Sequence, residues 1–250
     1  MIDYLFNLWR EHYIPDTSFQ FIMGFYGGEP LINIPLIKEI INYVEQSDTV
    51  GRQISFNMTT NAMLLDKYMD YLVEKKFNLF ISLDGDEKSQ SFRVDRLGNN
   101  SYEQVINNVK LLHVTHPEYF VKYVNFISVL HSRNDVEPIL HFFKTQFNKT
   151  PQISMVDSSG ISEDKKEDFK KVFQNIWQSL YKSPNCEVIE DEYFFEMPKG
   201  YLLSKLLYFT SGNVFLNYNQ LLLSNLDNNV IYTGTCPPFS KKLFLTPNST

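Results

Sequence analysis

A glycine pair followed by a glutamate lies at the end of the first long apolar segment of the chain. Residues 19–32 read FQFIMGFYGGEPLI, which predicts a strand leading into Gly27, Gly28, Glu29 and Pro30. Glycine has no Cβ, so the backbone of such a turn is open to a ligand. Glu29 adds a carboxylate at the carboxyl end of the strand, where parallel α/β folds bind their ligands. An ordinary tight turn is the competing interpretation.

Polar residues also end other predicted strands. Residues 54–61 alternate in polarity and end at Asn61, while residues 78–85 contain Ser82 and end at Asp84 and a glycine. Because the carboxyl ends of parallel strands meet at one edge of a sheet, these side chains are candidates for a common ligand site. Local hydrogen bonds within the turns explain Asn61 and Asp84 equally well.

The segments between the strands have helical periodicity. Helices are predicted over residues 2–11, 36–44, 65–75, 101–112, 134–146 and 162–180, and two further strands over residues 123–130 and 153–156. Ser101 and Gln104 have the spacing of a capping box, and Pro117 is expected to close the region after that helix. Strict alternation of strands and helices predicts an α/β fold with a parallel sheet and right-handed crossovers.

Composition excludes several classes of partner. The 250 residues are 43% hydrophobic and carry a net charge of −6, so neither nucleic acid nor an anionic membrane surface is an expected partner. No apolar run is long enough to span a bilayer and the first residues lack a signal sequence, which predicts a cytoplasmic protein. Two cysteines, Cys186 and Cys236, are too few for a disulfide framework.

The character of the sequence changes after residue 181. An acidic run covers residues 187–192 and is followed by aromatic residues, and the β-α alternation stops. We therefore expect one α/β domain over residues 1–182 and a second region over residues 183–250.

Taken together, the strand ends match the pattern of a known family. GGEP at residues 27–30, TN at 60–61, SLDG at 82–85 and the segment from Phe92 to Gly98 resemble the core of radical S-adenosylmethionine (SAM) enzymes. Gly234-Thr-Cys236 and the residues after it resemble the start of the auxiliary-cluster (SPASM) domain of peptide-modifying members, a group that includes sulfatase-maturating enzymes. The resemblance implies a partial (β/α) barrel over residues 1–182 and a linker with the beginning of a SPASM region over residues 183–250.

The resemblance also implies a cofactor site. The turn of Gly27, Gly28 and Glu29 would hold the methionine end of SAM, because carbonyl and carboxylate oxygens accept hydrogen bonds from its ammonium group. Ser82 and Arg93 would serve the SAM carboxylate or ribose, although Arg93 also suits a surface ion pair.

Three further residues complete the implied sites. Asn61 and Asp84 would shape the turns or touch the ligand's polar rim. Cys236 would be a first ligand of an auxiliary cluster. The substrate would be a ribosomally made peptide or protein.

One departure from the family pattern bears on activity. The family cleaves SAM with a [4Fe–4S] cluster held by three closely spaced cysteines after the first strand, whereas no cysteine precedes Cys186 here and no strand is predicted before residues 2–11. We therefore expect a fragment of a radical SAM peptide maturase that lacks the first β-α unit and does not cleave SAM alone. A degenerate module that binds a peptide or SAM is one alternative. A hydrolase-like enzyme that uses Glu29 and Asp84 as an acid–base pair is another.

Overall fold

A computed structural model gives the structure of the protein and describes residues 2–3, 6–7, 21–49, 51, 53–156, 161–186 and 189. The chain divides into two units, residues 1–186 and 187–250. Nearly all of the second unit lies outside the described residues, so the SPASM region and the ligand role of Cys236 stay predictions. The helix expected over residues 2–11 is described only at residues 2–3 and 6–7, which are helical.

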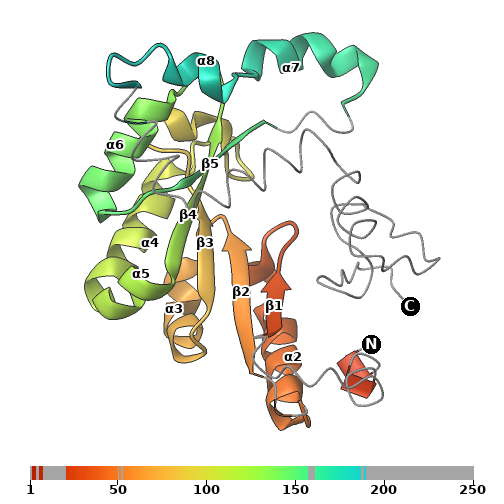
Figure 1. Cartoon of the computed structure of the whole chain (residues 1–250). Helices are drawn as coiled ribbons and strands as arrows, with labels where there is room; N and C mark the ends of the chain where they lie inside the picture. Colours follow the sequence, from red (N-terminus) through yellow and green to blue (C-terminus); the bar gives the residue numbers. More distant parts are fainter. Residues whose placement is uncertain are drawn as a thin grey trace, which may run out of the picture. The chain divides into compact units, whose positions relative to one another are not determined.

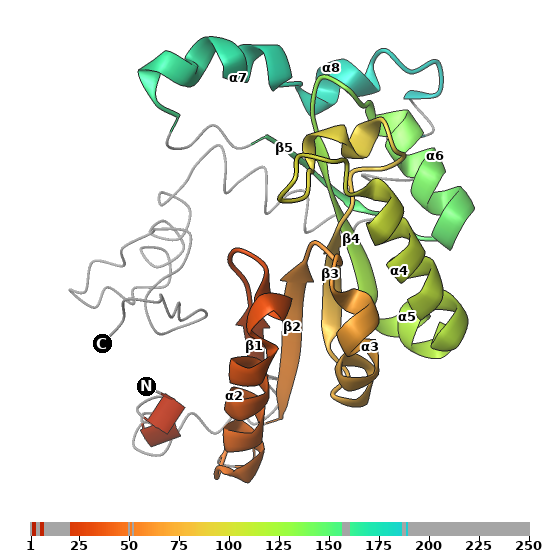
Figure 2. The ribbon, with the colours of Figure 1, turned by 180° about the vertical axis from the view of Figure 1, so that it is seen from behind.

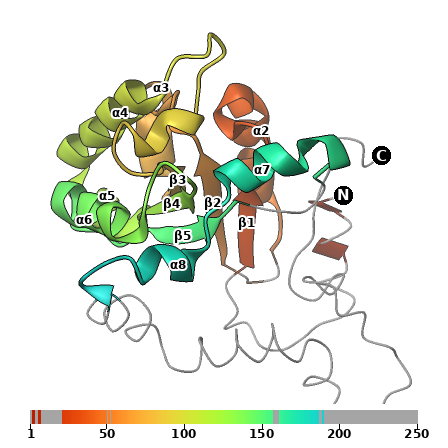
Figure 3. The same cartoon turned by 90° about the horizontal axis from the view of Figure 1, so that it is seen from above.

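A parallel sheet of five strands forms the centre of the first unit. Its strands are β1 (Phe21–Phe25), β2 (Ile54–Thr60), β3 (Asn78–Ser82), β4 (Val124–Leu130) and β5 (Gln152–Met155). The spatial order is β1-β2-β3-β4-β5 and every neighbouring pair is parallel (Figure 1). Figure 3 looks along the strands onto their carboxyl ends and shows the sheet curving. The predicted α/β fold, a partial (β/α) barrel with parallel strands, is confirmed.

Helices cover one face of this sheet. They are α2 (Ile34–Gln46), α3 (Leu65–Glu74), α4 (Tyr102–Thr115), α5 (Pro117–Tyr123) and α6 (Val136–Phe147). In Figure 2, α2 and α3 lie in front of the strands, and α5 and α6 lie to the right of β4. Alternate strand residues face these helices and are buried, for example Met58, Leu79 and Phe126. Their neighbours on the opposite face, such as Thr59 and Ser82, are only half-buried. None of the described helices is long and apolar enough to cross a membrane.

Short helical segments connect or follow these elements. They are the 3-10 helices η1 (Pro30–Asn33), η2 (Ser89–Phe92) and η3 (Glu163–Lys165) and the helices α7 (Lys166–Val172) and α8 (Ile176–Leu180). The single helix expected over residues 162–180 is therefore wrong. It breaks because Phe173 forms an antiparallel bridge with His131, which takes the chain out of helical geometry.

Two local expectations about α4 are also wrong. Ser101 does not cap the helix, because its hydroxyl donates to the carbonyl of Arg93 (2.8 Å), and Asn100 Oδ1 instead accepts from the N–H of Tyr102 (3.0 Å). Pro117 begins α5 rather than closing the region, because proline lacks the N–H that the first turn of a helix leaves unpaired.

The central strand gives a direct test of the packing. We expect Leu79→Ala to lower the free energy of unfolding by about 2–5 kcal/mol, because Leu79 is fully buried and its truncation leaves a cavity. The same substitution at Leu97, which is 86% exposed, should change it by no more than about 0.5 kcal/mol. Urea denaturation of both variants measures the difference, and equal effects would contradict this packing.

Candidate functional site

A cavity of about 470 Å³ opens at the carboxyl ends of β1, β2 and β3. Its volume falls within the range of about 300–1,000 Å³ that is usual for small-ligand sites. The residues that line it are Tyr26, Gly27, Gly28, Thr59, Thr60, Asn61, Met63, Ser82, Phe92, Arg93, Val94 and Ser101. Five of the seven residues predicted for the cofactor site are therefore brought together here. Glu29 and Asp84 are not among the lining residues.

The glycine turn after β1 forms one side of the cavity. Gly27 and Gly28 have φ angles of +102° and +45°, a backbone conformation that residues with a Cβ rarely adopt. A Cβ built at either position meets no atom within 4 Å, so the turn faces open space. The sequence thus requires glycine here for the backbone geometry and leaves the main chain accessible.

Glu29 sits behind this turn and holds it in place. Its side chain caps η1 by accepting from the N–H of Leu31 (3.1 Å). It also accepts from Thr60 Oγ1 (2.7 Å) and from the N–H of Asn61 (2.7 Å), both at the end of β2. The carboxylate therefore joins the ends of two strands, and its contact with a ligand ammonium stays a prediction.

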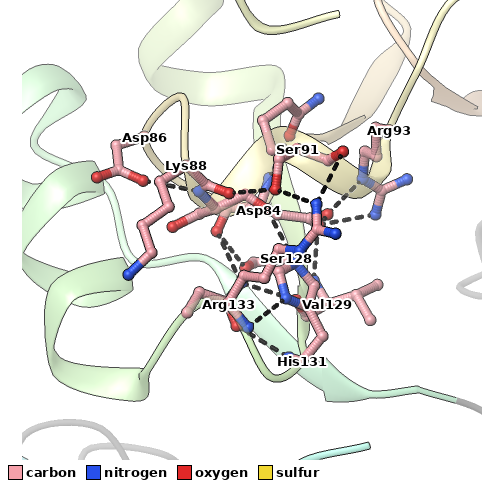
Figure 4. Close-up of polar contacts among 12 residues, drawn as sticks. Asp84, Asp86, Lys88, Ser91, Arg93, Ser128, Val129, His131 and Arg133 are labelled. Carbon is pink, nitrogen blue, oxygen red and sulfur yellow. Dashed lines mark hydrogen bonds and ion pairs between the residues drawn. The ribbon is translucent and has the colours of Figure 1, made fainter. Parts of the chain in front are cut away.

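Asp84 forms an ion pair beneath the opposite wall. The carboxylate is 2% exposed and accepts two hydrogen bonds from Arg93, from Nε at 2.8 Å and from Nη2 at 2.9 Å. The N–H of Val129 in β4 donates a third hydrogen bond to it at 2.8 Å (Figure 4). Arg93 reaches the cavity with 29% of its side chain exposed, so Asp84 supports the wall from inside.

The two carboxylates do not support a hydrolase-like acid–base pair. Glu29 and Asp84 each bind protein donors, and neither lines the cavity.

The backbone of Asp84 is tied to β4 and to its own loop. Its carbonyl accepts from Ser128 Oγ (3.1 Å) and from Asn134 Nδ2 (3.4 Å). Its N–H donates to Gln90 Oε1 (2.8 Å), and Gln90 Nε2 donates to Ser101 Oγ (3.1 Å). These bonds give the loop after β3 a fixed shape although it contains little regular structure.

His131 is buried beside this loop. Its Nε2 lies 2.9 Å from the carbonyl of Ser89, which can only accept, so Nε2 carries the proton. Its Nδ1 then accepts from the backbone N–H of Arg133 at 3.1 Å. Burial lowers the pKa of His131, and the positive charges of Arg133 and Arg93 act in the same direction, whereas Asp84 and the Ser89 carbonyl raise it.

Sequence reasoning missed the residues that support the site from behind. Gln90, Ser128, His131 and Asn134 are all buried and polar. The available signals were a serine inside the apolar run of β4 and the sequence HSRN directly after it. A buried polar residue must find a partner, but the sequence does not say which one.

Removal of Arg93 should leave a buried charge without its counter-charge. We expect Arg93→Ala to lower the free energy of unfolding by roughly 3 kcal/mol, because Asp84 is buried and loses two hydrogen bonds. Adding Asp84→Asn to that variant should recover part of the loss, since a neutral amide needs no counter-charge. Urea denaturation measures both, with the exposed Arg96→Ala as the control. No recovery in the double variant would contradict the ion pair.

His131 should make stability depend on pH. Its pKa in the folded protein lies below the ordinary value of about 6.5, so the unfolded chain binds the proton more readily. The free energy of unfolding should therefore fall as pH drops through about 6.5 towards the lower folded pKa. His131→Gln should weaken this dependence and His141→Gln, at an exposed position, should not. Urea titrations across pH 5–8 test it, and equal slopes for both variants would refute it.

A metal centre has no ligand set in the described part of the chain. Among those residues, no group of three or more His, Cys, Asp or Glu side chains is placed to hold a metal ion. Cys186, the described cysteine, is a free thiol. The residues present do not fit a [4Fe–4S] cluster, which is held by cysteine thiolates.

Comparison with known proteins identifies relatives of this chain. No protein-family model matches it. The chain is 29% identical over 128 residues to a cysteine-type anaerobic sulfatase-maturating enzyme of Clostridium novyi, which covers 49% of this chain and 33% of that protein. It is 25% identical over 212 residues to the radical SAM cyclopropyl synthase TigE of Paramaledivibacter caminithermalis, which covers 83% of this chain and 40% of that protein.

A solved structure is also similar in part. The structure of native anSMEcpe with bound AdoMet and Cp18Cys peptide matches 58% of this chain and 41% of its own, with a TM-score of 0.49 and 21% identity. The chain spans less than half the length of each of the two sequence relatives. By its sequence, the chain is radical SAM maturase-like, related to an anaerobic sulfatase-maturating enzyme and to a radical SAM cyclopropyl synthase.

Proposed function

We propose that the first unit is the SAM-binding half-barrel of a radical SAM enzyme that modifies a peptide or protein. The observation that carries the proposal is the cavity, in which Gly27, Gly28, Asn61 and Ser82 at the ends of β1, β2 and β3 meet Arg93 from the end of η2. The sequence similarity to an anaerobic sulfatase-maturating enzyme and to a radical SAM cyclopropyl synthase supports the same assignment.

The chemistry of the lining residues suits SAM. Its carboxylate would bind the Arg93 guanidinium, which matches a carboxylate in shape and charge. Its ammonium would bind carbonyl oxygens of the Gly27-Gly28 turn, and its ribose hydroxyls would bind Ser82 or Asn61. The exposed ring of Tyr26 and the side chain of Met63 add apolar surface for the adenosyl group.

We propose no role in the radical reaction itself for the described residues. In radical SAM enzymes an iron–sulfur cluster supplies the electron that cleaves SAM, and this chain has two cysteines, of which only Cys186 is described. We therefore propose that the residues of this chain bind SAM without cleaving it, and that a peptide or protein is the substrate of the radical reaction in which this half-barrel takes part. A non-catalytic module that binds SAM or a peptide is the second candidate, favoured by the same cysteine count.

Calorimetry with SAM tests the assignment of the cavity. We expect weak binding, with a Kd between about 1 μM and 1 mM, because much of the ligand's chelation in the family comes from the cluster. Gly27→Ala should weaken binding roughly tenfold, since a Cβ disfavours a positive φ and distorts the turn.

Gly51→Ala is the matched control. Gly51 also has a positive φ, +74°, but lies before β2, at the opposite end of the strand from the cavity. Unchanged affinity in this variant would show that backbone strain alone is not responsible. No heat of binding to the unaltered chain would overturn the proposed function, whereas sub-micromolar affinity would favour the binding module.

A further inference from the structure

We propose that Arg133 is a positioning residue that, from the turn after β4, fixes Phe92 and Arg93 on the cavity wall for a ligand bearing a carboxylate. The ligand part of this inference rests on the proposed SAM site. The positioning part rests on contacts between two loops of the first unit, namely residues 84–93 after β3 and residues 131–134 after β4.

Arg133 holds the loop after β3 through two kinds of contact. Its guanidinium carbon lies 3.7 Å from the ring centroid of Phe92, within the range of a cation–π interaction. Its Nη1 donates to Ser91 Oγ (2.9 Å) and reaches the Ser91 carbonyl at 3.5 Å. Figure 4 shows Arg133 extending from its own turn toward Ser91. The planar guanidinium thus binds two successive residues of η2 at once.

His131 fixes Phe92 from a second direction. The two rings meet edge to face with centroids 4.8 Å apart. His131 also donates from Nε2 to the carbonyl of Ser89, at the other end of η2. Because the backbone N–H of Arg133 donates to His131 Nδ1, both residues of the β4 turn act as one support.

This support reaches the ligand wall through Phe92 and Arg93. Both residues line the cavity, and the N–H of Arg93 donates to the carbonyl of Gln90 within the same helical turn (2.8 Å). Asp84 fixes the guanidinium end of Arg93, and the hydroxyl and N–H of Ser101 hold its carbonyl, whereas its N–H follows η2. Loss of the Arg133 contacts should therefore loosen the segment that presents Arg93 to a carboxylate.

The role of Arg133 can be tested separately from folding, because its side chain lies outside the buried core. Its side chain is exposed, and Ser91 Oγ keeps its own bond to the carbonyl of Lys88 (2.6 Å) when Arg133 is removed. Substitution at such a position leaves global stability nearly unchanged. If Arg133 is only a surface charge, its removal should have no effect on η2, whereas a positioning role predicts faster opening of that segment.

The test measures loop opening and ligand binding separately. Amide hydrogen exchange of residues 89–93 in Arg133→Ala should be about tenfold faster than in the unaltered chain, since a charged hydrogen bond and a cation–π contact are lost. SAM affinity, measured by calorimetry, should fall several-fold in the same variant. Decarboxylated SAM has no carboxylate to bind the Arg93 guanidinium, so its affinity should be equal for both proteins.

Two further variants complete the design. Arg96→Ala removes the same charge from a nearby exposed position and should change neither exchange nor affinity. Arg133→Lys keeps the charge and a hydrogen-bond donor but loses the planar fork, so it should restore part of both.

The outcomes separate this inference from the proposed function. Unchanged hydrogen exchange of residues 89–93 in Arg133→Ala would overturn the positioning role, whatever the measured affinity for SAM. Faster exchange without any SAM binding to the unaltered chain would overturn the proposed function and leave the positioning role standing. Faster exchange with equal loss of affinity for SAM and decarboxylated SAM would refute the link to the carboxylate.

Discussion

The buried carboxylate of Asp84 is the constraint on which the candidate site depends. A charge that is 2% exposed is stable only if it is paired and hydrogen-bonded, and Arg93 and the N–H of Val129 meet that need. Satisfying Asp84 also fixes where the loop after β3 must pass, because Arg93 is nine residues further along the chain. The same group joins β3 to β4, so sheet geometry and loop geometry are set together.

A similar arrangement operates on the other side of the cavity. Glu29 binds the N–H of Asn61 and the hydroxyl of Thr60, so the turn after β1 is fixed to the end of β2. In both cases an acidic residue of the motif is directed into the protein, and the motif residues left facing the cavity offer glycine backbone, small polar side chains and a guanidinium. The motif residues therefore divide into supports and cavity-facing groups, a division that residue type alone does not reveal.

The sequence predicted the fold well because its signals were local. The alternating polarity of a strand such as residues 54–60, the helical spacing of apolar residues and the polar strand ends can each be read from a single segment. The alternation of strands and helices with right-handed crossovers then predicts a parallel sheet. The predictions of a long helix over residues 162–180 and of a cap at Ser101 were wrong because residues outside each segment bind there. Phe173 forms a bridge with His131, and the Ser101 hydroxyl donates to the carbonyl of Arg93. The supporting layer of Gln90, His131 and Asn134 was missed for the same reason.

These observations also explain how an α/β half-barrel can keep a shaped cavity at its strand ends with little regular structure around it. The loop of residues 84–93 is held by partners from outside it, including Ser128 and Asn134 on the Asp84 carbonyl and His131 on the Ser89 carbonyl. Each of these partners comes from β4 or the turn after it, a strand that does not itself line the cavity. The strand next to a binding site can thus determine its shape without touching the ligand, because buried carbonyl groups must be satisfied wherever the fold supplies donors. Residues of that kind are expected to affect affinity through the loop they hold, and their effect is separable from that of the groups that face the ligand.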